Sequence, residues 1–541
     1  MQAARCLAFL TLAVPLHGGA EAGVQIPVTD ATVIAKCGTC HAPDSSGNMQ
    51  YISSARATPD GWGDAVKRMI RANRVTLTPA EARAIVKYLS SEHGLTPEEA
   101  KPVMYYPERR VHDETGIASE GVINACAKCH PLARALSWRR SPEDWKQFVA
   151  VHAPSLKPRA NQEAVAFLTQ AAPFDISEWT KWHAHKKPAM AGRWLIRAHD
   201  LGHGQFYGEM DVRPRKDDGE FETKVMLKSV KDGSTLFRTG QMIVYDGYEW
   251  RGRSQGAATA AAAPDDLRKE ARETMWVSPD GSQAEGRWFW GQYQEFGFDV
   301  KMQRASSGPS LLAVDPTALQ TGARGKQVRL VGDRFPASAK VGDLHLGPGV
   351  TVERIVSSTD RELVAEVDVA PDAAIGERGI ALGSSTFKDT MTIYDRVDYV
   401  KVTPESSMAA YGDQDHARGF QQYEATGYQR GPDGRLHTAD DLPLGPVDVT
   451  WSMEVFYEVD ASKRDLVGNV NSTGFFTPAE KNPNINSDVW VIATATNDRN
   501  KANKPLVGKG YLVVTVPTYS FNGHTYVRDL DRWIEEGSDT R

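Results

Sequence analysis

The feature that most constrains this sequence is a pair of short motifs, CGTCH at residues 37–41 and CAKCH at residues 126–130. In each motif, two cysteines separated by two residues are followed directly by a histidine. This is the spacing of c-type haem attachment, in which both thiols form thioethers to the porphyrin and the imidazole binds the iron. The sequence therefore predicts two covalently attached haem c groups. The expected attachment and iron-binding residues are Cys37, Cys40 and His41 for the first haem, and Cys126, Cys129 and His130 for the second.

The cysteine usage of the whole chain supports this interpretation. The chain contains five cysteines, and the first of them, Cys6, lies in a predicted signal peptide. The four motif cysteines are then the only thiols of the mature protein. Four cysteines in an exported protein ordinarily suggest disulfides, and two Cys-x-x-Cys pairs can also bind zinc. Zinc is the competing interpretation, and the histidine after each pair and the long separation between the pairs disfavour it.

The N-terminus has the pattern of a secretory signal peptide over residues 1–22. Arg5 precedes an apolar run, and AEA at residues 20–22 supplies the small residues of a cleavage site. Pro15 interrupts the run before it reaches the roughly 20 apolar residues that a membrane-spanning helix needs. No later segment is long and apolar enough to span a bilayer, so we expect a soluble protein exported to the periplasm.

Length and charge narrow the function classes further. A chain of 541 residues exceeds the roughly 250–300 residues at which single hydrophobic cores stop growing, so several domains are expected. With 41% apolar and 24% charged residues, the composition is that of folded protein. The formal charge of −6 gives no basic footprint for nucleic acid and no polybasic stripe for a membrane surface.

The haem motifs lie inside a longer internal repeat. RATPDGW at residues 56–62 matches RRSPEDW at 139–145, and AIVKYL at 84–89 matches EAVAFL at 163–168. In the first pair, a hydroxyl residue suits the N-cap of a helix and the proline after it suits the first helical position. Each copy is therefore predicted to be a small all-helical cytochrome c domain. The expected bounds are residues 23–105 and 106–190.

The second axial ligand of each iron is predicted from the same repeat. Seven residues after the repeated tryptophan, the first copy has Met69 and the second has His152. Methionine and histidine are the usual second ligands of cytochrome haem, so we assign the first haem to His41 and Met69 and the second to His130 and His152. A thioether ligand raises the reduction potential, so electrons would pass from the bis-histidine haem to the histidine–methionine haem.

Other residues compete for these ligand positions. Met69 could be a core methionine, which is the usual role of this residue. Met49 and Met104 are the alternative thioethers, and His93 and His112 are the alternative imidazoles. Met49 lies uncomfortably close in sequence to the first haem motif to reach the opposite face of the haem.

After about residue 190, the pattern changes from helical periodicity to alternation of apolar and polar residues, which is typical of antiparallel strands. Residues 191–303 are predicted to form an antiparallel β barrel or sandwich. Two immunoglobulin-like β domains are expected at residues 304–398 and 399–541. The fold class is thus a helical dihaem module followed by three antiparallel β domains. The β segments contain no recognisable catalytic motif, so no catalytic residue is assigned.

This combination resembles the α (dihaem) subunit of quinohemoprotein amine dehydrogenase. The resemblance covers nearly the whole mature chain, from CGTCH and CAKCH through the two tryptophan helices to the β domains that begin near GRWLIRAHDLGHGQFYGEMDV at residues 192–212. It implies an electron-transfer subunit of a periplasmic complex that oxidises primary amines to aldehyde and ammonia.

The resemblance also implies partners. The oxidation takes place at a cysteine tryptophylquinone on a small separate subunit, beside a propeller-like β subunit, which together with this chain make a heterotrimer. Electrons then pass through the two haems to a soluble cupredoxin or cytochrome c. No nucleic-acid partner is expected.

Two other functions fit the same motifs. A dihaem peroxidase would also be exported with two Cys-x-x-Cys-His motifs, but it would need an open or displaceable axial position on one iron. A dihaem cytochrome subunit of another periplasmic dehydrogenase would keep the electron-transfer role and change only the partner.

Overall fold

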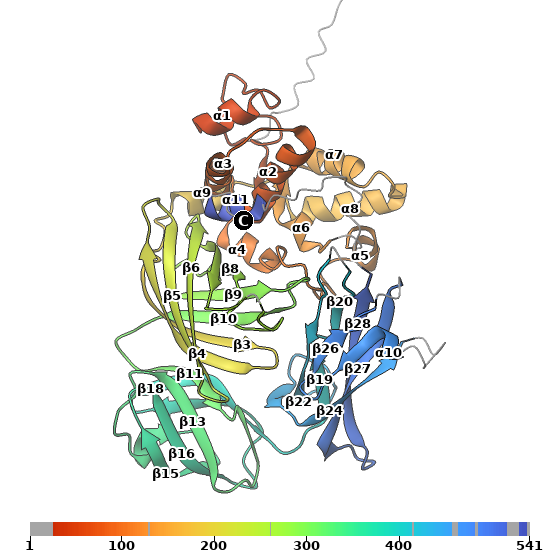
Figure 1. Ribbon diagram of the computed structural model, residues 1–541. Helices are drawn as coiled ribbons and strands as arrows, with labels where there is room; N and C mark the ends of the chain where they lie inside the picture. Colours follow the sequence, from red (N-terminus) through yellow and green to blue (C-terminus); the bar gives the residue numbers. More distant parts are fainter. Residues whose placement is uncertain are drawn as a thin grey trace, which may run out of the picture.

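The computed structural model describes residues 25–127, 130–259, 261–413, 416–456, 464–481, 485–516 and 530–537. The predicted signal peptide and Cys129 lie outside these residues. A helical N-terminal region sits over one end of a β barrel, one further β unit lies beyond the other end, and the last β unit lies beside the barrel (Figure 1). The expected order, a helical region followed by largely antiparallel sheets, is confirmed.

The helical region forms from the repeated sequence elements. Its helices are α1 (Ala31–Cys37), α2 (Pro59–Asn73), α3 (Pro79–Glu92), α4 (Pro97–Ala100), the 3-10 helix η1 (Lys101–Val103), α5 (Glu120–Cys126), α6 (Ala133–Leu136), α7 (Pro142–His152), α8 (Pro158–Ala171) and α9 (Ser177–Ala184). The predicted caps are present: the hydroxyl of Thr58 accepts a hydrogen bond from the N–H of Gly61, and that of Ser141 accepts one from the N–H of Asp144. Helices α2 and α7 therefore begin at the same position of the repeat.

The repeated tryptophans tie each of these helices to the next. The indole Nε1 of Trp62 on α2 donates a hydrogen bond of 2.9 Å to the carbonyl of His93 at the end of α3. Trp145 on α7 donates an equivalent 2.9 Å bond to the carbonyl of Ala172 at the end of α8. Both indoles are buried. Each hydrogen bond therefore pairs an indole N–H and a carbonyl at a helix end that would otherwise lack a partner.

The helical region is not purely α-helical, in contrast to the prediction. Strand β1 (Ala55–Ala57) of the first repeat pairs antiparallel with β2 (Trp138–Arg140) of the second. These short strands precede α2 and α7 and join the two halves directly. The sequence does not predict these strands, because three residues are too few to show the alternation of apolar and polar residues that marks a strand.

One carboxylate neutralises the centre of this junction. Arg56 and Arg139 hold the same place in the repeat and face each other across β1 and β2. Glu99 on α4 accepts two hydrogen bonds from Arg56, at 2.7 and 2.9 Å, and one from Arg139, at 3.0 Å. Both guanidinium groups are buried, so the carboxylate prevents two like charges from lying unpaired in the interior.

The barrel is a closed sheet of strands in the order β10-β3-β4-β5-β6-β7-β8-β9. Its strands are β3 (Gly192–Asp200), β4 (Gly204–Pro214), β5 (Glu220–Ser229), β6 (Thr235–Tyr245), β7 (Glu249–Gln255), β8 (Ala271–Val277), β9 (Gln283–Trp290) and β10 (Phe296–Arg304). The helical region plugs one end, because Leu95 and Trp182 belong to the barrel core. Tyr248, in the β6–β7 turn, donates a 2.7 Å hydrogen bond to the carbonyl of Leu95. The helical region is thus packed directly against the barrel.

The remaining strands form two β units. The first packs a β11-β13-β16-β15 sheet against a β12-β18-β17-β14 sheet, and the second contains sheets β19-β22-β23, β20-β28-β27-β24 and β21-β26-β25. The bounds are β11 (Ser310–Asp315), β12 (Ala318–Gln320), β13 (Lys326–Asp333), η2 (Val341–Asp343), β14 (Leu344–His345), β15 (Val350–Ser358), β16 (Glu362–Val369), β17 (Gly376–Leu382) and β18 (Ser385–Tyr394), then β19 (Tyr399–Thr403), β20 (Ser406–Ala410), β21 (Gln421–Gln422), β22 (Glu424–Gln429), β23 (Leu442–Pro446), β24 (Val449–Val455), α10 (Arg464–Val467), β25 (Gly468–Val470), β26 (Phe475–Pro478), β27 (Ser487–Arg499) and β28 (Pro505–Thr515). The prediction of purely antiparallel sheets is wrong in two places, because β12 pairs parallel with β18 and β20 pairs parallel with β28. Both are short strands that enter a sheet beside its last strand.

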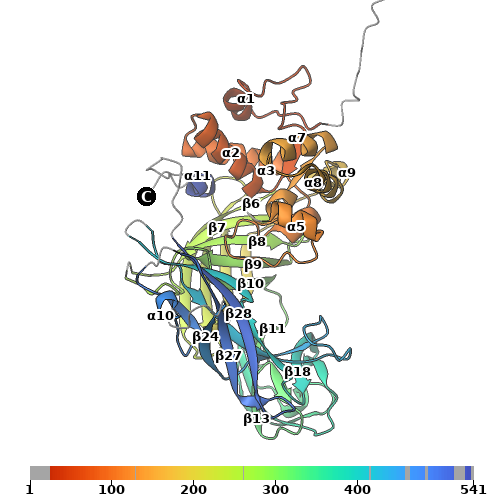
Figure 2. The same ribbon diagram turned by 90° about the vertical axis from the view of Figure 1, so that its right-hand side faces the viewer.

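The C-terminal helix leaves the last β unit, which the sequence did not predict. Helix α11 (Leu530–Glu536) lies against the helical region and the outer face of the barrel (Figures 1 and 2). Leu530, Trp533 and Ile534 are buried in the same cluster as the first haem-motif helices and the outward-facing Ile243 and Tyr245 of β6. The end of the chain therefore joins the helical region to the barrel.

Neutralising the shared carboxylate should destabilise the helical region. In Glu99→Gln, the two buried guanidinium groups of Arg56 and Arg139 lose their counter-charge, which costs about 3 kcal/mol. We expect the melting temperature of this region to fall by on the order of 10 °C, followed by haem absorbance or calorimetry. Glu98→Gln is the matched control, because Glu98 is the exposed neighbour on the same short helix.

The pKa of Glu99 determines how the stability of this region depends on pH. Burial alone would raise the pKa of Glu99, but the hydrogen bonds and charge of Arg56, together with the charge of Arg139, lower it. A lowered folded-state pKa gives stabilisation that is complete above the unfolded value of about 4.3 and is lost as pH falls through the folded pKa. The melting temperatures of the parent protein and Glu99→Gln should therefore converge in acid. A difference that stays constant there would contradict the role of this carboxylate.

Candidate functional site

The first candidate site is a cavity of about 380 Å³ between α1, α2 and α3. Cys37, at the end of α1, and Cys40 and His41, in the turn after it, line one part of the wall, and Met69 of α2 also lines it. Apolar side chains from α2, α3 and the loops beside them make up much of the remainder. These include Ile52, Trp62, Ala65, Val66, Val75, Leu77, Ile85 and Leu89. Two thiols, an imidazole and a thioether facing one apolar cavity are the donor set that a c-type haem requires.

The two predicted iron ligands of this site have surroundings that suit ligation. The ring of His41 lies edge-on to Tyr51, with 6.2 Å between the ring centres, and its Nδ1 is buried without a hydrogen-bond partner. The side-chain amide of Asn73 donates a 3.5 Å hydrogen bond to the Sδ of Met69. Asn73 lies one turn after Met69 on α2, so it orients the thioether.

The second candidate site brings together His130 and His152. Their ring centres are 5.9 Å apart. Two imidazoles that share one metal, each with a metal–nitrogen distance of about 2 Å, would have ring centres about 6 Å apart. The Nδ1 of His130 lies 2.9 Å from the carbonyl of Pro131. A hydrogen bond there leaves Nε2 free for a metal and fixes the orientation of the ring.

The other residues of the second site are only partly described. Cys126 ends α5 and is half-buried, whereas Cys129 lies outside the described residues. Burial, then the charges of His130, Arg134 and Arg68, lower the pKa of His152. His152 is therefore neutral at neutral pH, as a metal-binding imidazole must be.

The competing ligands lie elsewhere. Met49 is buried in the core of the first helical domain and does not line the cavity that holds His41. Met104 lies on a groove beside the barrel. His93 is fully buried beside Trp62, and His112 packs against Tyr105. None of these four candidates lines the first cavity.

The cysteine pairs also lie in different cores. Cys37 packs against the cluster that contains α2 and α3, whereas Cys126 packs against the cluster that contains α7 and α8. A single zinc site would need thiols from both pairs at one point. Among the residues that the structure describes, no group of three or more His, Cys, Asp or Glu side chains could hold a metal ion. This arrangement supports separate haem sites over a shared zinc site.

A wall of three side chains separates the two sites, and sequence reasoning did not identify it. Phe148 of α7 stacks on His152, with ring centres 4.9 Å apart and planes 12° apart, and it also lines the first cavity. Trp138 and Arg140 of β2 line the same cavity. A signal was present in the repeat, since Ala57 is the residue that matches Arg140 and Ala65 the one that matches Phe148. Large side chains that replace alanine in only one copy mark the contact between copies.

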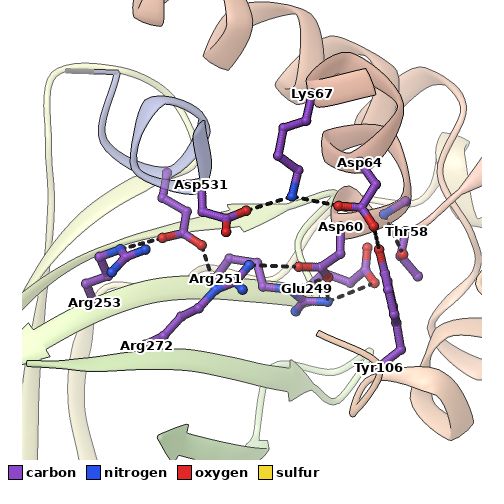
Figure 3. A network of polar contacts seen from close by, with 12 residues as sticks. Thr58, Asp60, Asp64, Lys67, Tyr106, Glu249, Arg251, Arg253, Arg272 and Asp531 are labelled. Atoms are coloured by element: carbon purple, nitrogen blue, oxygen red, sulfur yellow. Dashed lines mark hydrogen bonds and ion pairs between the residues drawn. The ribbon is translucent and has the colours of Figure 1, made fainter. Parts of the chain in front are cut away.

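The face of α2 turned toward the barrel is held by ionic contacts (Figure 3). Lys67 of α2 lies 2.6 Å from Asp64 on the same helix and 2.7 Å from Asp531 on α11. Asp60, in the first turn of α2, lies 2.6 Å from Arg251 on β7 and 3.3 Å from Arg272 on β8. The helix that presents Met69 is thus fixed to the barrel and to the C-terminal helix.

Helix α11 is held in the same way. Glu535 lies 2.5 Å from the Nε of Arg253 on β7 and 2.7 Å from the Nε of Arg272 on β8. The carboxylate is almost completely buried, and both arginines are largely so. Arg272 therefore bridges α2 and α11 through Asp60 and Glu535.

None of the helices in the described part of the chain has the length and apolar character needed to cross a membrane.

Known protein families match nearly the whole chain. Four family models match in order: "Quinohemoprotein amine dehydrogenase A, alpha subunit, haem binding" at residues 28–170, and the alpha-subunit domains II, III and IV of quinohemoprotein amine dehydrogenase at residues 187–305, 308–395 and 400–524. No curated protein matches the sequence. The first model covers both candidate sites.

Several solved structures resemble parts of the fold. A redesigned β barrel is 14% identical, covers 22% of this chain and 92% of its own, and gives a TM-score of 0.18. Human protocadherin-24 EC1-2 is 13% identical and covers 39% of this chain and 100% of its own, with a TM-score of 0.18. The tandem Ig repeats of Dlar are 11% identical with the same coverage and a TM-score of 0.14. TM-scores this low do not establish a shared overall fold or a shared function.

Removing the charge of Glu535 should release α11. In Glu535→Gln, the buried Arg253 and Arg272 lose a shared counter-charge, at a cost of about 3 kcal/mol. Backbone amides of α11 should then exchange hydrogen about 100-fold faster, because local opening is governed by the same free energy. Hydrogen exchange followed by mass spectrometry measures this. Glu353→Gln, at an exposed position of β15, should leave the exchange unchanged. Equal exchange in both variants would contradict the clamping role.

Proposed function

The chain belongs to the family of quinohemoprotein amine dehydrogenase α subunits, and on this premise we propose that it is a dihaem c electron-transfer subunit. Members of this family form one subunit of a multi-subunit amine dehydrogenase, and that subunit contains a haem-binding domain. The proposal adds that residues 23–105 and 106–190 each hold one covalent haem. It also assigns the oxidation of amine to another polypeptide.

One observation carries the proposal: Cys37, Cys40, His41 and Met69 all line a single apolar cavity. The first three come from the end of α1 and the turn after it, and Met69 comes from α2. Because these segments are separated in sequence, their meeting is a property of the fold. The second haem is supported by the 5.9 Å separation of the His130 and His152 rings. In both sites, a side chain able to bind iron comes from the helix that follows the repeated Ser/Thr-Pro pair.

The residues have separate tasks. We assign Cys37 and Cys40, and likewise Cys126 and Cys129, to covalent attachment, which keeps the cofactor fixed relative to its helices. When bound, haem supplies reversible one-electron transfer between ferrous and ferric iron. Met69 is proposed to raise the potential at the first site and His152 to lower it at the second. Electrons would then enter at the second site and leave from the first.

The partners follow from the family resemblance. We propose a periplasmic complex with a small subunit that carries cysteine tryptophylquinone and a propeller-like β subunit. The thiols of this chain support that division, because all four mature cysteines are assigned to haem and none remains to form a quinone cofactor. A soluble cupredoxin or cytochrome c is the proposed acceptor. A second side chain able to bind iron at each site, Met69 at the first and His152 at the second, weighs against a peroxidase, which needs an open position on one iron.

Haem content tests the number of sites. The purified mature chain should exceed its amino-acid mass by two haems, and intact-protein mass spectrometry measures this directly. Cys37→Ala combined with Cys40→Ala should remove one haem, and Cys126→Ala combined with Cys129→Ala should remove the other. A parent chain that carries one haem or none would overturn the proposal.

The ligand assignment is tested by changing the thioether. Met69→His should abolish the red-region absorption band of thioether-ligated ferric haem. It should also lower the higher of the two midpoint potentials by a substantial part of the roughly 0.8 V range that axial ligands set. Spectroelectrochemistry resolves both haems. Met49→Leu is the matched control, because Met49 is buried elsewhere, and it should leave the band and both potentials in place. If only the lower potential moved, the assignment would be wrong.

A further inference from the structure

A buried cation without an acidic partner lies on the wall of the first cavity. Arg140 is only 9% exposed, and its Nε is buried without a hydrogen-bond partner. No carboxylate lies within ion-pair distance of its guanidinium among the residues that the structure describes. Burial lowers the pKa of Arg140 to about 10; the more distant charge of Asp144 opposes this shift, and that of Arg68 adds to it. It is therefore still protonated at neutral pH, and a buried charge of this kind is costly unless something pairs with it.

Aromatic rings fix the position of this guanidinium but do not neutralise it. Its central carbon lies 4.4 Å from the ring centre of Trp138, 5.3 Å from that of Phe148 and 5.8 Å from that of Trp145. Such contacts stabilise a cation and orient its plane. These contacts do not use the N–H donors of the guanidinium, which can therefore donate hydrogen bonds to a group bound in the cavity that Arg140 lines.

The fold itself does not require this charge. In the first repeat, the position that matches Arg140 is Ala57, which is buried. Its backbone N–H forms the equivalent hydrogen bond, to the carbonyl at the end of the second helix of its own repeat. Ala57 donates to the carbonyl of His93, and Arg140 donates to that of Ala172. The backbone role of this position is thus met by alanine. The guanidinium is an addition found in one copy only, and it lines the cavity of the other.

We propose that Arg140 binds a propionate carboxylate of the haem held by His41 and Met69. The proposal rests on the proposed function, since it requires a haem in the first cavity. Haem carries two propionates, and a guanidinium is the side chain best suited to pair with a carboxylate through two parallel hydrogen bonds. The second repeat would in this way supply a binding residue to the haem of the first.

This pairing makes Arg140 a positioning residue with an electrostatic effect. A fixed positive charge near the porphyrin disfavours the ferric state, which carries one more positive charge than the ferrous state. Arg140 therefore raises the potential of the first haem, in the same direction as Met69. Through Phe148 it also stands next to His152, so it lies on the side of the first cavity that faces the second site.

The test compares two substitutions with a charge-matched control in the full-length haem protein. Arg140→Gln removes the charge, Arg140→Lys keeps the charge but not the two-pronged geometry, and Arg159→Gln removes an exposed charge on α8. Spectroelectrochemistry gives both potentials, and resonance Raman reports the propionate-bending mode. We expect Arg140→Gln to lower the potential of the methionine-ligated haem and to shift the mode. Arg140→Lys should restore most of the potential while the mode stays shifted, and Arg159→Gln should change neither.

Several outcomes would overturn the proposal. If Arg140→Gln leaves the mode and the potential as they are in Arg159→Gln, Arg140 does not bind the propionate. If Arg140→Gln fails to fold, Arg140→Lys decides, and an unchanged mode in that variant overturns the proposal. A purely structural role would lower the melting temperature without moving either spectroscopic readout. Haem content and the thioether band, measured on the parent chain, separate this result from failure of the proposed function, because their absence overturns both.

Discussion

The relative position of the two candidate sites depends on the pairing of Glu99 with Arg56 and Arg139. The two arginines face each other on β1 and β2 because the repeat places them at the same position. Without an acid between them, the pairing of these strands would bring two buried like charges together. Glu99 comes from α4, outside both repeated segments. The two copies of the repeat can therefore pair within one chain because Glu99 on α4 supplies the counter-charge, and this junction fixes the distance between the sites.

The junction lets two copies of one scaffold differ where function requires it. Helices α2 and α7 share their caps and their tryptophan-to-carbonyl hydrogen bonds, so both ligand positions lie on a helix at the same distance from its start, although α7 ends at His152 and α2 continues to Asn73. Met69 and His152 can then differ without a change in fold. The further asymmetries, Arg140 and Phe148, concentrate at the face where the copies meet. Differences between the copies thus concern the ligand and the contact between sites, whereas the shared residues maintain the helices.

Sequence reasoning succeeded where the signal is local and failed where it is not. The N-caps Thr58 and Ser141 could be read from a hydroxyl residue followed by proline, because a cap is decided within one turn of helix. The pairing of β1 with β2 involves three residues per strand, too few for a period to be recognised. Glu99 and Glu535 are ordinary acidic residues in sequence, and only the fold shows that each pairs with two buried arginines. The parallel strand β20 was missed because alternation along a strand carries no information about the direction of its partner.

The barrel gives the ligand helix a rigid support. Met69 lies near the C-terminal end of α2. Earlier in this helix, Asp60 is paired with arginines of β7 and β8, and Lys67 with Asp531 of α11. A thioether is a weak ligand on a flexible side chain, so the bond to iron that we propose for Met69 would be sensitive to movement of the backbone that carries it. Anchoring the helix on the side away from the cavity restricts that movement and keeps these charged groups away from the proposed iron site. The C-terminal helix completes this support from the far end of the sequence, which accounts for a chain that crosses two β units and then returns to the helical region.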